Sequence, residues 1–77
     1  MAAAEALDSL DKAIAADPAD ARFHANRGAA LLRLRRPAES VEACDASIAL
    51  DPEKFWPHNL RAGALIKLGR ATEAVAS

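Results

Sequence analysis

Apolar residues recur every three or four positions in two stretches of the chain, and both stretches stop in the same way. The first series is Leu7, Leu10 and Ile14, and the second is Val41, Cys44 and Ile48. Such spacing places the side chains on one face of a helix. Each series ends at an Asp-Pro pair, and proline disfavours helical geometry in itself and in the residue before it. The pattern therefore predicts helices that end near Ala16 and Leu50.

Two further helices are predicted directly after these Asp-Pro pairs. One runs from about Ala21 to Leu34, with Asp20 as a candidate N-cap, and the other from about Phe55 to Leu68. Short linkers then separate them from the next helices, which we expect to begin near Pro37 and Ala71. The two linkers are Arg35-Arg36-Pro37 and Gly69-Arg70. The chain thus reads as a series of helical hairpins with no predicted strand.

The hairpins repeat with a period of 34 residues. The pairs that this shift superimposes include Asp17 and Asp51, His24 and His58, Arg27 and Arg61, and Leu31 and Leu65. We therefore divide residues 1–77, taken as one segment, into the second helix of a partial repeat (1–20), a complete repeat (21–54) and a partial repeat (55–77). Units of this length bury their core by stacking on their neighbours and expose an extended surface for binding. The prediction is an all-α stack.

In its period and its residues the chain resembles the tetratricopeptide repeat family, and the resemblance covers nearly all of it. The complete unit has Gly28 for close helix contact, Leu31 where the family usually has tyrosine, and the Asp51-Pro52 pair at its end. Residues 26–28 resemble a variant common in bacterial members. The departures are His24, Arg27, Ser40 and Cys44, which stand where the family usually has larger apolar, alanine or aromatic residues. The resemblance implies a short right-handed α-solenoid that binds other proteins.

Composition is consistent with a small helical protein that carries no targeting signal. Alanine fills 21 of the 77 positions, and alanine is the best helix former. A single cysteine excludes an internal disulfide and is compatible with a reducing compartment, so we expect a cytoplasmic protein. Residues 1–10 lack the basic start and apolar run of a signal peptide, and no stretch approaches the ~20 apolar residues of a membrane span. Membrane association has no support.

Charge is divided between the two kinds of helix although the net charge is only −1. Residues 21–34 and 55–68 contain basic side chains and no acid, whereas the other helices are mainly acidic. In the family resembled, the first helix of each hairpin lines the concave groove. The residues that the resemblance places there are Arg22, Asn26, Arg33, Trp56, Asn59 and Lys67. A basic groove of this kind suits an extended acidic peptide or a terminal carboxylate.

Several of these residues have a structural alternative. We expect Arg27 to pair with Asp11 or Asp45 inside the stack, and Arg61 to pair with Asp45. The offset of 16 residues from Asp11 to Arg27 is the same as that from Asp45 to Arg61. Arg22, Arg33 and Lys67 are expected to be free, either for groove binding or as a solvated face. Trp56 either covers the junction between repeats or forms an exposed hot spot for binding.

The chain starts and stops out of phase with the repeat, which exposes apolar surface. Leu7 and Leu10 are expected to lack the first helix on which they would pack, and exposed apolar stripes mark interfaces. We therefore expect either a segment of a larger protein or self-association through uncapped ends. The larger protein would use the repeats as a structural spacer for another domain, such as a glycosyltransferase.

Catalytic, metal and nucleic-acid functions are not favoured, and no cofactor is expected. Cys44 lies in the middle of an apolar stripe, where a buried structural thiol is expected instead of a nucleophile. His24 and His58 occupy equivalent positions on helices about 8–10 Å or more apart, too far to share a zinc ion without further ligands. They are interpreted as half-buried packing residues. Arg33, Arg35 and Arg36 cluster at one turn, yet the broad positive footprint of a nucleic-acid binder is missing.

Overall fold

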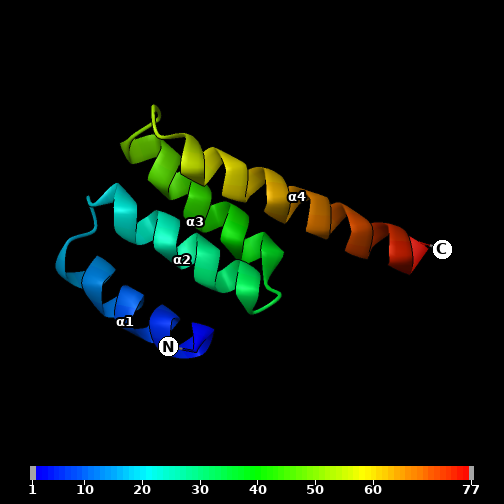
Figure 1. The fold of residues 1–77 in the computed structure, drawn as a ribbon, viewed down its shortest axis with the longest axis horizontal. Coiled ribbons are helices and arrows are strands. Elements are labelled where there is room, and N and C mark those ends of the chain that lie inside the picture. The colour runs from blue at the N-terminus through cyan, green and yellow to red at the C-terminus, as the bar shows by residue number, and fades with distance from the viewer. Residues whose placement is uncertain (1, 77) are drawn as a thin grey trace.

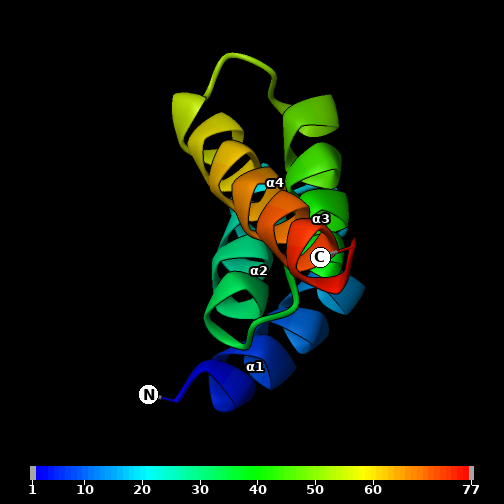
Figure 2. The same cartoon turned by 90° about the vertical axis from the view of Figure 1, so that its right-hand side faces the viewer.

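The computed structural model describes the backbone of residues 2–76 and the side chains of residues 2–70, and it is all-α within that part of the chain. Its helices are α1 (Ala3–Ala16), α2 (Ala21–Arg33), α3 (Pro37–Leu50) and α4 (Phe55–Ala76). Consecutive helices pack side by side and alternate in direction, and α2 also contacts α4 (Figure 1). The end view shows α1 at the foot of the stack, below α2 (Figure 2). The predicted all-α class is confirmed.

The predicted ends of the first three helices are confirmed to within one residue. At each Asp-Pro pair the aspartate amide closes the helix, with Asp17 donating to the Ala13 carbonyl and Asp51 to the Ser47 carbonyl, both at 2.9 Å. Asp20 is the N-cap of α2, since its carboxylate accepts the Arg22 amide at 3.0 Å. No helix of the described part is long and apolar enough to cross a membrane.

The turn between α2 and α3 is a Schellman-type helix end. Arg35 adopts a left-handed φ of 60°, its amide donates to the Leu32 carbonyl, and the Arg36 amide donates to the Leu31 carbonyl. Pro37 then opens α3 in its first turn, where the missing N–H costs nothing. The chain therefore reverses within three residues, which brings α3 back against α2.

The corresponding turn in the second unit is absent, so the predicted linker at Gly69-Arg70 and the new helix from Ala71 are wrong. Helix α4 continues through these residues to Ala76, and its second half projects beyond the other helices (Figure 1). The equivalent of Pro37 is Ala71, so no proline forces the residue before it out of the helical region. A glycine inside a helix costs only about 1 kcal/mol, which does not end α4 at Gly69.

The tightest contact in the molecule is between α2 and α3. Leu31 and Cys44 are fully buried there, and a Cβ added at Gly28 would lie 2.9 Å from the Cys44 sulfur. Two buried hydroxyls complete the contact: Ser40 donates to the Gly28 carbonyl at 2.7 Å and Ser47 donates to the Ala21 carbonyl at 2.9 Å. The close approach expected at Gly28 and the buried thiol expected at Cys44 are both confirmed.

The α1–α2 and α3–α4 junctions repeat the same two polar contacts. Arg27 donates to Asp11 at 2.8 Å and Arg61 donates to Asp45 at 2.6 Å, as the 16-residue offset predicts. Two further contacts were not predicted from the sequence: ring nitrogens of the histidines lie 2.8 and 3.1 Å from the carbonyls of Pro18 and Pro52. His24 is half-buried, whereas His58 is exposed. Each histidine therefore ties its helix to the preceding loop, which corrects the packing role expected for His58.

We predict opposite effects of adding one methyl group at two glycines. Gly63→Ala should raise the free energy of unfolding by about 0.5–1 kcal/mol, because nothing lies within 4 Å of the new Cβ and alanine favours the helix. Gly28→Ala should lower it, because overpacking against Cys44 costs about 1–3 kcal/mol. Urea denaturation measures both values. If Gly28→Ala raised the free energy of unfolding as much as Gly63→Ala, the close contact between Gly28 and Cys44 would be contradicted.

We also predict that Ala71→Pro ends α4 near Gly69, so that the second half of the helix is lost. Proline at this position restores the feature that stops α2, and Arg70 is then pushed out of the helical region. Cα chemical shifts of residues 69–76 should move from helical toward random-coil values, while those of α1 to α3 stay unchanged. Helical shifts that persist through Gly69 and Arg70 in the variant would show that the missing proline is not the reason for the long helix.

Candidate functional site

Three adjoining hollows run along one face of α2, and together they are called the groove. The first, of about 380 Å³, lies between the start of α2 and the start of α4. The second, of about 390 Å³, lies between α1 and α2, and the third, of about 280 Å³, lies between α2 and α4. Asn26 lines the first two hollows, and Ala29 and Arg33 line the second and third. Trp56 lines all three.

Trp56 is placed in the groove by the first turn of α4. Pro57, the next residue, is buried and also lines the first hollow. The side chain of Trp56 stays 44% exposed. The indole therefore lies at the junction of α2 and α4 and also presents an open apolar surface, and its role as a binding hot spot stays a prediction.

The floor of the groove is low because small residues lie along α2. Ala25 is buried beneath the first hollow and Ala29 lies beneath the second and third. Asn26 is exposed between them and offers an amide to both of the hollows that it lines. The arrangement leaves room above α2 with a polar group at its centre.

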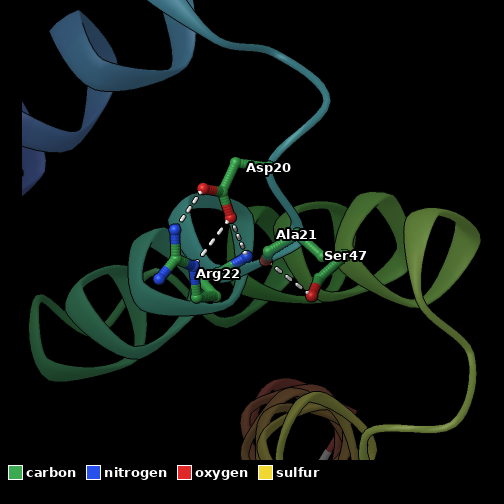
Figure 3. A network of polar contacts seen from close by, with 4 residues as sticks. All are labelled: Asp20, Ala21, Arg22 and Ser47. Atoms are coloured by element: carbon green, nitrogen blue, oxygen red, sulfur yellow. Dashed lines mark hydrogen bonds and ion pairs between the residues drawn. The ribbon is translucent and has the colours of Figure 1, made fainter.

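Arg22 lies at the rim of the first hollow, but the expectation that it is free is wrong. Its guanidinium donates two hydrogen bonds to Asp20, from Nε to Oδ1 at 3.1 Å and from Nη2 to Oδ2 at 2.7 Å (Figure 3). The hydrogen bond from the Arg22 side chain lowers the pKa of Asp20. Because one carboxylate caps α2 and also holds this arginine, the positive charge at this end is largely neutralised.

The other predicted groove residues are not all brought together. Arg33 is exposed and lines the second and third hollows, and Lys67 is exposed and lines the third. Neither forms an ion pair with a carboxylate whose side chain the structure describes. Asn59 is exposed on α4 but lines none of these three hollows. The free positive charge of the groove therefore lies toward the C-terminal end of α2.

Two charged residues that line the groove were missed from the sequence. Lys54 and Asp51 both line the first hollow, and they belong to the loop before α4, so a comparison of charge between helices does not find them. The available signal was the Asp-Pro motif, because Asp51 is its first residue and Lys54 follows it by two positions. Arg36, one of the three arginines clustered at the α2–α3 turn, is not free to bind a partner because it pairs with Glu39. The hydrogen bond from Arg36 lowers the pKa of the Glu39 carboxyl.

Exposed apolar side chains lie mainly on α4 instead of α1. Leu7 and Leu10, the candidates for self-association, are half-buried against the stack, and Leu10 also lines the second hollow. The large apolar side chains that remain exposed in the described part of the chain are Leu50, Phe55, Trp56, Leu65 and Ile66. In the described part of the chain the apolar surface available for association therefore lies mainly on α4.

The cysteine and the two histidines considered for catalysis or metal binding have structural contacts. Cys44 is fully buried, and its burial raises the pKa of the thiol, which makes it a poor nucleophile. No three His, Cys, Asp or Glu side chains among residues 2–70 are grouped closely enough to hold a metal ion. His24 and His58 are instead occupied with proline carbonyls.

Comparison with known proteins gives no match of any kind. The sequence matches no model of a protein family, no characterised protein and no experimentally determined structure. A functional assignment therefore depends on the geometry of the groove and on the internal repeat.

The buried thiol predicts how stability depends on pH. An unfolded cysteine has a pKa of about 8.5, and the folded value is higher, so the folded state disfavours the thiolate. The free energy of unfolding should be fully retained below about pH 8.5 and should fall as the pH rises toward the folded pKa. The chain contains no tyrosine, and cysteine is the side chain whose ordinary pKa, about 8.5, lies in this range, so the effect is assigned to Cys44.

Denaturation of the parent and of Cys44→Ala at several alkaline pH values measures this effect. The variant should show a flat profile between about pH 8 and 9.5, where the parent loses stability. Equal slopes for the two proteins in that range would contradict the assignment to the thiol.

Proposed function

We propose that this chain is a tetratricopeptide-type segment of a right-handed α-solenoid, a non-catalytic module that binds a protein through an extended peptide. The 34-residue period supports the repeat type, and it is joined by the contacts that recur at equivalent positions of the two junctions. Side-by-side helical hairpins in which the first helices contact each other, as α2 and α4 do, are the arrangement that such a stack requires.

The exposed Trp56 at the meeting point of three hollows is the observation that carries the proposal. A tryptophan that remains 44% exposed above a groove offers a large apolar area to a partner. Such residues contribute most to binding when a partner excludes water from them. An extended peptide fits the site better than a compact ligand, because the hollows continue along α2 and do not close into one cavity.

The polar groups of the groove favour an acidic peptide at one end. Asn26 can bond the peptide backbone, since its amide both donates and accepts hydrogen bonds. Arg33 and Lys67 supply positive charge beyond Trp56 that no carboxylate among the described side chains pairs with. The opposite end has little net charge, since Arg22 pairs with Asp20, and Lys54 and Asp51 both line the first hollow. We therefore place the acidic side chains of the peptide near the end of α2 and its apolar side chain on Trp56.

The test is a titration of Trp56 fluorescence with extended peptides. The chain has one tryptophan, so the signal reports the groove alone. We expect a peptide with an apolar residue followed by two or three acidic residues to bind, and Arg33→Glu and Lys67→Glu each to weaken the Kd by roughly threefold to tenfold. Lys12→Glu is the matched control, since Lys12 lies on α1, pairs with Asp8 and lines none of the three hollows.

Two results would count against this proposal. Equal weakening by Lys12→Glu would show that binding follows net charge and not the groove. Binding without any change in the emission of Trp56 would place the peptide elsewhere on the molecule.

A further inference from the structure

Among the side chains described for α4, three large apolar ones besides Trp56 are exposed to solvent. Phe55 is 74% exposed, Ile66 is 55% exposed and Leu65 is 41% exposed. A series of large apolar side chains on one small protein marks an interaction surface. The internal repeat indicates what this surface fits, since the same positions of α2 are already in contact with another helix.

The α2–α3 contact serves as the template. The buried residues of α2 are Ala25, Gly28, Ala30 and Leu31, and Gly28 lies directly against α3. Moving 34 residues along the sequence gives their equivalents on α4, which are Asn59, Ala62, Ala64 and Leu65. Ala64 is buried, whereas Asn59, Ala62 and Leu65 are exposed. The face that α2 presents to α3 is therefore present on α4 but lacks a helix against it among the described residues.

The other half of the template is present on α1. The buried residues that α3 presents to α2 are Ser40, Ala43, Cys44 and Ser47. Their equivalents, 34 residues earlier, are Ala6, Ser9, Leu10 and Ala13. None of these is buried, and the first three line the second hollow of the groove, between α1 and α2. The second hollow therefore occupies the position on α1 that α2 occupies on α3.

The signs of charge on α4 and α1 also match those of the template, in which α2 is basic and α3 is acidic. Helix α2 is basic without any acid and α3 is acidic without any base. The side chains described for α4 likewise include three bases and no acid, whereas α1 carries three carboxylates and one lysine. Attraction between α4 of one molecule and α1 of another therefore favours the same pairing.

We propose that α4 of one copy docks in the second hollow of another copy, packing on α1 as α2 packs on α3. Both halves of the interface are carried by one chain in the register of its own repeat, which identifies the partner as a second copy. The contact is head-to-tail, since two different surfaces meet, and it leaves one free surface at each end of a dimer. Assembly therefore continues beyond the dimer as concentration rises.

The contact is looser than its template. Ala62 replaces Gly28 and Leu10 replaces Cys44, and a Cβ at Gly28 already lies within 2.9 Å of the Cys44 sulfur. Two larger side chains keep the helices farther apart, so the association depends on concentration. Because Trp56 also lines the second hollow, docking covers part of the groove and competes with any peptide there.

The test is the mass at sedimentation equilibrium over a range of protein concentrations without added ligand, so its outcome is independent of peptide binding. The monomer mass is 8.1 kDa. We expect the average mass of the parent to rise through that of a dimer and beyond. The variants are Ile66→Glu, which places an acid on the α4 face, and Ser9→Lys, which places a base in the second hollow. Both residues are exposed, so circular dichroism should show the parent fold.

Mixing the two variants distinguishes head-to-tail docking from other arrangements. Each variant alone should stay monomeric, because one of its two surfaces is blocked. An equimolar mixture should form a dimer and stop there, since Ser9→Lys contributes an intact α4 and Ile66→Glu an intact hollow. Leu50→Glu, at an apolar side chain of similar exposure outside both surfaces, should associate like the parent.

Three outcomes would overturn the proposal. The first is a parent that remains monomeric at every concentration. The second is association of Ser9→Lys alone, which would indicate an α4–α4 contact. The third is a mixture of the two variants that stays monomeric.

Discussion

The close approach of α2 and α3 is the contact on which the rest of the structure depends. It requires a residue without a side chain at Gly28, because the Cys44 sulfur occupies the space that a Cβ would take. The buried hydroxyls of Ser40 and Ser47 add hydrogen bonds to α2 carbonyls, so polar side chains are accommodated without an unsatisfied group. With α2 fixed on α3, helix α1 packs on α2 and α4 packs on both α2 and α3.

The polar contacts at the junctions have a different role from this packing. The pair of Arg27 with Asp11 and that of Arg61 with Asp45 are both partly exposed, and exposed pairs contribute only about 0.2–1 kcal/mol. These ion pairs act mainly on orientation, because each constrains the rotation and the axial position of one helix relative to the helix before it. The histidine contacts to Pro18 and Pro52 add a second constraint at each junction, and the two units therefore stack alike.

The same small residues that permit close packing also shape the surface. Alanines along α2 bring neighbouring helices near and leave a low floor, above which Trp56 is the one large side chain lining all three hollows. The net charge also differs along the groove. Asp20 neutralises Arg22 at one end, while Arg33 and Lys67 leave the other end positively charged. The helix cap of α2 thus influences the surface that a partner would meet.

The sequence by itself determined the period, the helix ends at the Asp-Pro pairs and the pairing of Arg27 and Arg61, because prolines, caps and fixed offsets are local or repeated signals. Tertiary structure decided the rest. Arg22 was expected to be free, but its nearest acid is also the cap that orients it. Gly69 was expected to end a helix, but a glycine only permits a turn, whereas Pro37 enforces one. Which hollows Trp56 lines, and which apolar residues stay exposed on α4, depends on how whole helices pack, and no local pattern encodes that.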